Sequence, residues 1–86
     1  MSRKPIIAAN WKMNMTPQET TDFIKQFQTL VGNENTVDIV IAPPAVSIAS
    51  AAALLSTTDN IRIAAQNMHH EASGAFTGEI NSTMLK

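Results

Sequence analysis

Three short, mostly apolar runs divide this 86-residue chain at regular intervals, and they limit its fold more than any other feature. The runs cover residues 6–9, 37–42 and 61–65, and polar residues, glycine or proline flank them. Short runs of this kind are typical of strands that are buried on both faces of a sheet. The intervening stretches are long enough for helices, so the order of elements predicts an α/β fold with parallel strands.

The first intervening stretch carries strong helix signals. Thr16 can cap the free backbone N–H groups, Pro17 suits the first helical position, and Glu19 completes a capping box. An apolar stripe then follows at helical spacing. Gly32 is expected to end this helix in the left-handed conformation, which glycine adopts cheaply. The members of the stripe are Phe23, Ile24, Phe27, Leu30 and Val31.

Two further helices complete the alternation. Pro43 and Pro44 end the second strand, because proline has no N–H to donate to a neighbouring strand. Residues 45–55 predict a helix of small residues in which Ser47 is a candidate cap. A third helix is expected to start at about Asn81. In such an array all strand-to-helix links lie at the carboxyl ends of the strands, where α/β barrels place their catalytic residues.

Composition sets the broad class of the protein. The length fits one small domain over residues 1–86, with no second domain. The apolar fraction of 44% and the net charge of −1 indicate a globular protein, and no basic stripe points to nucleic acid. The chain has no cysteine, which excludes disulfides and thiolate metal sites and fits a cytoplasmic protein. Residues 37–55 are too polar for a membrane span, and the N-terminal apolar run is too short for a signal peptide.

Asn10 and Lys12 follow the first strand directly. Side chains of a strand alternate between its faces, so these two point the same way if the strand continues through them. A lysine beside an amide at the end of a buried strand predicts an anion site. A solvated lysine that closes the strand is the alternative on position alone.

The link after the third run, residues 66–79, has neither helical nor strand periodicity. Ordered domains rarely keep such a long loop without a use, although a flexible surface excursion is the simpler alternative. Phe76 lies between glycines in this loop, which favours packing against the core or a partner. His69 and His70 do not predict a metal site, because neighbouring residues of an extended segment face opposite ways and no third ligand has suitable spacing.

Four segments, in order and in spacing, resemble the N-terminal part of the triosephosphate isomerase family. The resemblance covers about residues 3–86, and its first and last segments are highly specific in combination. The segments are Asn10-Trp11-Lys12-Met13-Asn14, Val40-Ile41-Ala42-Pro43-Pro44, Ala64-Ala65-Gln66-Asn67 and Ser73-Gly74-Ala75-Phe76-Thr77-Gly78-Glu79-Ile80.

The resemblance implies the first two βα units and part of the third of a (β/α)₈ barrel. The implied reaction interconverts dihydroxyacetone phosphate and glyceraldehyde 3-phosphate through an enediolate, without metal or organic cofactor, in a homodimer. Lys12 would stabilise the phosphate and the enediolate, and Asn10 would bind substrate and hold the lysine. Residues 66–79 would form the dimer loop with Thr77 at its tip. Gln66 and Asn67 would brace its base, Phe76 would support it, and Glu79 would pair across the interface.

The chain also departs from the family pattern. Met15 replaces a residue that is often glycine, and Met68 replaces one that is often cysteine. A family barrel has eight βα units in about 250 residues, and its glutamate base and histidine electrophile come later in the sequence. The 86 residues alone are therefore expected to be inactive and to fold poorly without the rest of the barrel. The alternatives are a non-catalytic module that docks a partner through residues 66–79, and a small phosphate-binding protein that uses Lys12.

Overall fold

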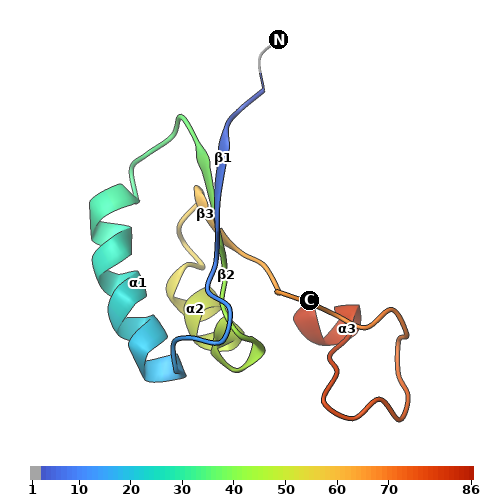
Figure 1. Cartoon of the computed structure of the whole chain (residues 1–86). Helices are drawn as coiled ribbons and strands as arrows, with labels where there is room; N and C mark the ends of the chain where they lie inside the picture. Colours follow the sequence, from blue (N-terminus) through green and yellow to red (C-terminus); the bar gives the residue numbers. More distant parts are fainter. Residues whose placement is uncertain (1–2) are drawn as a thin grey trace.

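The computed structural model describes residues 3–86 and contains a three-stranded parallel sheet with sheet order β1-β2-β3 (Figure 1). None of the helices in this part of the chain is long and apolar enough to cross a membrane. The elements are β1 (Ile6–Asn10), α1 (Pro17–Val31), β2 (Asp38–Ala42), the 3₁₀ turn η1 (Ala45–Ser47), α2 (Ile48–Leu54), β3 (Ile61–Ile63) and α3 (Ser82–Leu85).

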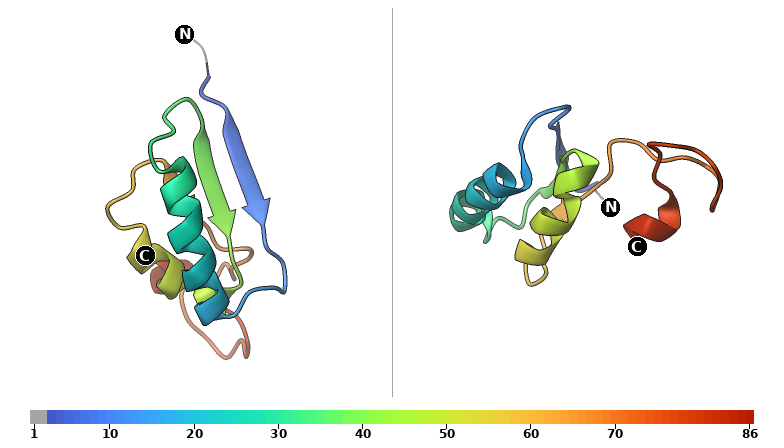
Figure 2. Two further views of the ribbon diagram at one scale, coloured as in Figure 1. Left: turned by 90° about the vertical axis from the view of Figure 1, so that its left-hand side faces the viewer. Right: turned by 90° about the horizontal axis from the view of Figure 1, so that it is seen from below.

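Neighbouring strands are in register from end to end. Ala8 pairs with Val40, and Val40 pairs with Arg62 on its other side. The helices α1 and α2 both lie on one side of the sheet, while the chain beyond β3 leaves on the other (Figures 1 and 2). The predicted alternation of parallel strands and helices is therefore confirmed, and it is the arrangement of the first part of a (β/α)₈ barrel.

The core lies between the sheet and its two helices. Ile24 of α1 is fully buried there, and partly buried apolar residues from several segments of the chain pack against the same cluster. By contrast, β1 is an open edge whose five residues are all exposed, with Ile6 at 64% and Ile7 at 61%. The buried apolar residues of the core are Ile24, Ile39, Ile41, Ala51, Leu55 and Ile61.

The start of α1 follows from its capping chemistry. The Glu19 N–H donates to the Thr16 hydroxyl oxygen at 3.1 Å, and the Thr16 N–H donates to Glu19 Oε1 at 3.0 Å. The predicted capping box is thus confirmed. The Thr16 backbone N–H, followed by the Thr16 hydroxyl, lowers the pKa of the Glu19 carboxyl, because both contacts favour the charged form.

Several local predictions were wrong in detail. Gly32 ends α1 with a φ of −61°, in the right-handed region, so conformational freedom is not the reason for glycine there. A Cβ at this position would lie 2.5 Å from the Gln28 carbonyl oxygen, so space is the reason. Leu30 belongs to the apolar stripe but is 81% exposed, because α2 covers only part of that stripe. Ser47 makes no cap hydrogen bond, and β2 and β3 are shorter than the apolar runs.

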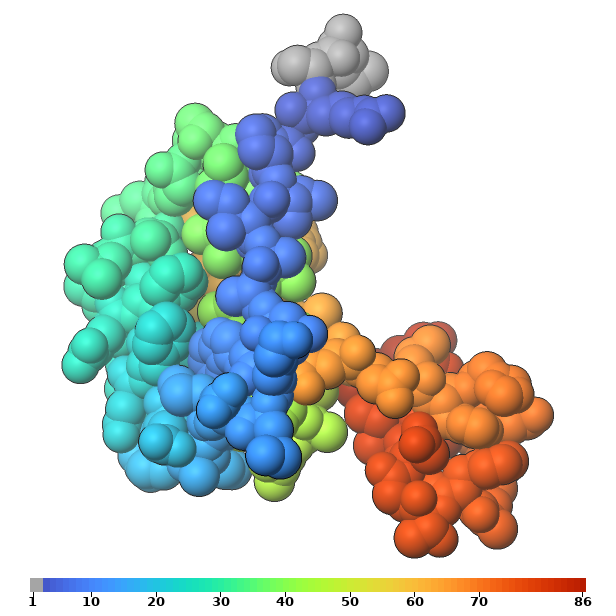
Figure 3. All heavy atoms as spheres, in the orientation of Figure 1, coloured from blue at the N-terminus to red at the C-terminus, as the bar shows by residue number. Residues whose placement is uncertain are grey.

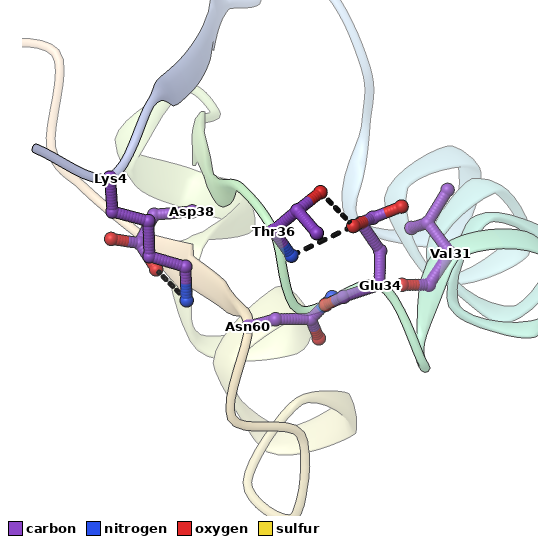
Figure 4. A network of polar contacts seen from close by, with 6 residues as sticks. All are labelled: Lys4, Val31, Glu34, Thr36, Asp38 and Asn60. Atoms are coloured by element: carbon purple, nitrogen blue, oxygen red, sulfur yellow. Dashed lines mark hydrogen bonds and ion pairs between the residues drawn. The ribbon is translucent and has the colours of Figure 1, made fainter. Parts of the chain in front are cut away.

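Polar contacts tie the amino-terminal ends of the strands to the end of α1 (Figure 4). The buried Asn60 donates from Nδ2 to the carbonyl oxygens of Val31 at 2.8 Å and Glu34 at 2.6 Å. Lys4 pairs with Asp38 at 3.2 Å. The Glu34 carboxylate accepts hydrogen bonds from the Thr36 hydroxyl and N–H, and the hydroxyl contact is the main cause that lowers the pKa of Glu34.

Candidate active-site turn and the projecting loop

The turn that carries Lys12, here named the lysine turn (residues 11–15), begins where β1 ends. Asn10 is the last residue of the strand, and Lys12 has a φ of +56°, in the left-handed region that favours glycine. The strand therefore does not continue through Lys12, so the condition on which period-two alternation would align the two side chains is not met. Both residues are exposed at the carboxyl end of the sheet, where an anion has free access.

Local hydrogen bonds hold this turn to β1 and β2. The Lys12 N–H donates to Asn10 Oδ1 at 2.8 Å, so the Asn10 side chain holds the lysine through its backbone. The Trp11 N–H donates to the carbonyl oxygen of Ala42 at 3.0 Å and extends the pairing of β1 with β2 by one bond. The Asn14 side chain closes the turn by donating to the Trp11 carbonyl oxygen at 2.9 Å.

Gln66 connects the lysine turn to the segment after β3. Its side-chain Nε2 donates to the carbonyl oxygen of Lys12 at 2.9 Å and to that of Ala42 at 2.8 Å. One amide therefore bridges the carboxyl ends of β1 and β2 from a residue 54 positions beyond Lys12. Backbone groups of the lysine turn are thus fixed from the ends of all three strands.

The far end of the turn holds contacts that the sequence did not predict. Met15 has a φ of +80°, and its carbonyl oxygen accepts a hydrogen bond of 2.9 Å from the hydroxyl of Ser47. Ser47 is fully buried, although the sequence suggested a helix cap. Thirty-two residues separate the two partners, so no local pattern could have indicated this contact.

Aromatic packing supports the turn from below. The rings of Trp11 and Phe23 meet edge to face with centroids 5.4 Å apart, and Phe23 stacks on Phe27 at 5.3 Å. A shallow cavity of about 310 Å³ lies between Trp11, Asn14, Met15 and Phe23. The turn therefore rests on α1 through an apolar contact.

Residues 64–81 form a loop that projects away from the sheet, with no helix or strand before α3 (Figure 3). The His69 N–H donates to the Ile80 carbonyl oxygen at 2.7 Å, and the Asn81 side chain donates to the Ala72 carbonyl oxygen at 2.7 Å. The Asn81 side chain also accepts the Met84 N–H and caps α3, so the expected helix does start after Asn81. These contacts give the loop a defined shape despite its exposure.

Phe76 packs within the loop rather than into the core. Its ring lies 4.0 Å from the His69 ring, measured between centroids, and it remains 46% exposed. Gly74 has a φ of +144°, and a Cβ there would come within 2.5 Å of the Phe76 ring. Glycine is therefore required at Gly74 both for its backbone conformation and for the space that the ring occupies.

The part of the loop that follows Gln66 projects away from the sheet (Figure 3). Asn67, Thr77 and Glu79 are exposed, and the Glu79 N–H donates to the Phe76 carbonyl oxygen at 3.0 Å. Of the loop residues considered from the sequence, only Gln66 has a hydrogen bond to the Lys12 residue within residues 3–86. The tip of the loop is therefore exposed on the surface of residues 3–86.

The charged groups of the site leave the lysine side chain open to an anion. Among residues 3–86 Lys4 pairs with Asp38, and His70 Nε2 lies 3.5 Å from Glu71 Oε1, so the Lys12 ammonium group has no carboxylate partner in this part of the chain. The same residues contain no cluster of three or more histidine, aspartate or glutamate side chains that could hold a metal ion. An exposed lysine without a carboxylate partner, at the carboxyl edge of a parallel sheet, is suited to bind an anion.

Comparison with known proteins connects this geometry to one family. The family model described as triosephosphate isomerase matches residues 5–86. A triosephosphate isomerase from Dictyoglomus turgidum is 50% identical over 84 residues, which cover 98% of this chain and 33% of that protein. One from Synechococcus sp. (strain CC9902) is 46% identical over 85 residues and is covered to 35%.

The structural comparison agrees. The crystal structure of triosephosphate isomerase from Bartonella henselae matches with a TM-score of 0.84 and 32% sequence identity, over 96% of this chain and 33% of the other. The chain thus spans about a third of the length of the curated relatives it matches. On the family match, the sequence identities and the shared fold, this chain belongs to the triosephosphate isomerase family.

Proposed function

We propose that these 86 residues supply the lysine part of an active site that interconverts dihydroxyacetone phosphate and glyceraldehyde 3-phosphate. The observation that carries the proposal is the lysine turn, whose backbone is held by Asn10 and Gln66 in a chain of this family. The Lys12 ammonium would neutralise the substrate phosphate and the negative charge of the enediolate. Asn10 would hydrogen-bond the substrate beside it.

The proton transfers would require groups from the rest of the barrel. In this family a glutamate acts as the base and a neutral histidine polarises the carbonyl group. Neither His69 nor Glu79 is proposed for these roles, because both lie in the projecting loop, away from the lysine turn. We therefore expect the isolated 86-residue chain to show no significant turnover, and we expect the active protein to be cytoplasmic.

The projecting loop is proposed to pack against a second copy in a homodimer. The loop is shaped internally by the contact between the tilted rings of Phe76 and His69, yet Thr77 and Glu79 are exposed. In the dimer, Thr77 would approach the partner's lysine turn, and Glu79 would pair with a basic group across the interface. Asn67 would brace the base of the loop beside Gln66. A docking module without catalysis is the alternative, and it would keep the assembly but lack turnover.

A barrel chimera tests the proposal. In this chimera, the full chain replaces the matching segment of the Dictyoglomus turgidum relative, which is 50% identical to it. We expect turnover of glyceraldehyde 3-phosphate, and we expect Lys12→Met to lower kcat/KM by about 10³-fold because one fixed electrostatic group is lost. Lys25→Met is the matched control on the exposed face of α1 and should change kcat/KM less than about twofold. A folded chimera without turnover, or a Lys12→Met variant that keeps more than a tenth of kcat/KM, would refute the proposal.

A further inference from the structure

Two residues of the lysine turn adopt a backbone conformation that L-amino acids disfavour. Lys12 has a φ of +56° and Met15 a φ of +80°, and neither is glycine. A side chain at positive φ crowds its own backbone, so such residues persist only where surrounding contacts hold them. The conformation of the turn therefore depends on the groups that grip its two ends.

Residues from different elements form hydrogen bonds with the two ends of the lysine turn. At the lysine end, Asn10 binds the Lys12 N–H and Gln66 binds the Lys12 carbonyl oxygen. At the other end, the Ser47 hydroxyl donates to the Met15 carbonyl oxygen at 2.9 Å. Ser47 lies in η1, just after β2, and has no exposed surface. The donor of this hydrogen bond is therefore shielded from water, and its position is set by η1 and β2.

Helix capping does not account for Ser47. The residue precedes α2, but its side chain makes no cap hydrogen bond, and its backbone is in the right-handed helical region with φ −104° and ψ −2°. A buried serine must bond its hydroxyl to some partner, because an unpaired hydroxyl in the interior is unfavourable. The partner here is the strained end of the lysine turn.

We propose that Ser47 is a positioning residue for Lys12, acting through the Met15 carbonyl oxygen. By holding Met15 at positive φ, the Ser47 hydroxyl keeps the turn from relaxing and so keeps Lys12 in place. The inference rests on the proposed function only in that Lys12 is taken to act on the substrate. Its physical part, a hold on the turn, can be measured without any turnover.

A double-mutant cycle in the barrel chimera tests the kinetic part. Ser47→Ala removes the donor, and we expect kcat to fall about tenfold, with a smaller change in KM. Ser47→Thr keeps the hydroxyl and should restore most of the lost rate. In a Met15→Gly background the strain is absent, since glycine adopts positive φ freely. There, Ser47→Ala should lower kcat less than about twofold.

Hydrogen exchange tests the physical part. In Ser47→Ala the Lys12 amide should exchange at least about fivefold faster, while the Ile39 amide in β2, which donates to the Asn60 carbonyl oxygen, should keep its rate. Unchanged exchange at Lys12 overturns the proposal, whether or not the chimera turns over substrate. An equal loss of kcat in the Met15 and Met15→Gly backgrounds also overturns it. If the chimera folds without turnover but Lys12 exchange rises, the proposed function fails while the hold on the turn stands.

Discussion

Asn60 offers a sharp test of how the fold is held together at the amino-terminal ends of the strands (Figure 4). The residue is 9% exposed, and its Nδ2 donates to two carbonyl oxygens, those of Val31 and Glu34. Its Oδ1 is buried and has no hydrogen-bond partner among residues 3–86. The Asn60 amide therefore stabilises the fold through two hydrogen bonds and destabilises it through one buried oxygen that has no partner.

These contacts set the size of two substitutions. Asn60→Ala deletes two hydrogen bonds of about 1 kcal/mol each, and removal of the unpaired oxygen offsets about 1 kcal/mol of that loss. The free energy of unfolding should thus fall by only about 1 kcal/mol. Asn60→Asp keeps the shape but directs a carboxylate oxygen at two carbonyl oxygens, with no cation beside it. This buried, unpaired charge should lower the free energy of unfolding by about 3–5 kcal/mol at pH 7.

Thermal unfolding of the barrel chimera measures both effects. With roughly 2–4 °C per kcal/mol for a protein of this size, the melting temperature should fall by about 2–4 °C for Asn60→Ala and by about 6–20 °C for Asn60→Asp. Asn33→Asp in the exposed link after α1 is the matched control and should shift stability by less than about 0.5 kcal/mol.

The pH dependence of Asn60→Asp gives a second readout. Burial and the two carbonyl oxygens disfavour the charged form, so the pKa of the introduced carboxyl should lie above its unfolded value. The loss in free energy of unfolding is then complete above the pKa of the folded state. The loss becomes smaller as the pH falls through that pKa, because the protonated carboxyl can donate to one carbonyl oxygen. Equal melting temperatures for Asn60→Asp and Asn60→Ala at pH 7 would show that Asn60 does not donate to these carbonyls.

Two further predictions concern the lysine turn and the start of α1. At ordinary negative φ, alanine is more stable than glycine by about 0.4–1 kcal/mol, whereas at the +80° of Met15 the order should reverse, so urea unfolding should rank Met15→Gly above Met15→Ala. A higher stability to urea for Met15→Ala than for Met15→Gly would argue against the left-handed conformation of Met15. The lowered pKa of Glu19 means that its contribution to stability is present above the unfolded pKa and disappears as the pH falls through the folded value. Glu19→Gln should therefore flatten the acid side of the stability profile, while an unchanged slope between neutral and acid pH would contradict the role of the capping box.

Features with local causes were predictable from the sequence. The start of α1 was one, because Thr16, Pro17 and Glu19 act on backbone groups within one turn of helix. The parallel order was another, because short apolar runs separated by helices leave few arrangements that bury them. The stripe of α1 was predicted less well. Helical spacing identifies which residues share a face but not how far α2 extends over it, so Leu30 remained exposed.

The details of the site depended on contacts between distant residues. The positive φ of Lys12 could not be predicted from its neighbours alone, since besides the local bond from Asn10 its carbonyl oxygen is held by Gln66, 54 residues further on. Ser47 was misjudged for the same reason, because a serine before a helix is usually a cap and its actual partner lies 32 residues earlier. The resemblance to a family points to Asn10, Lys12 and Gln66, and the geometry shows how the backbone of the lysine turn is held.

The placement of the lysine turn is largely internal to these three strands. Asn10 at the end of β1, Ser47 after β2 and Gln66 after β3 each contribute one side-chain hydrogen bond to it. Since none of these bonds comes from the remaining barrel, changes to them should alter electrostatic stabilisation by Lys12 while leaving the proton-transfer groups in place. The expected kinetic signature is a lower kcat with an unshifted pH profile, because the pH profile reports the acid and the base rather than the lysine. A pH profile that shifts together with kcat in Gln66→Ala would mean that the turn also positions the acid–base residues, and that the two parts of the site cannot be separated.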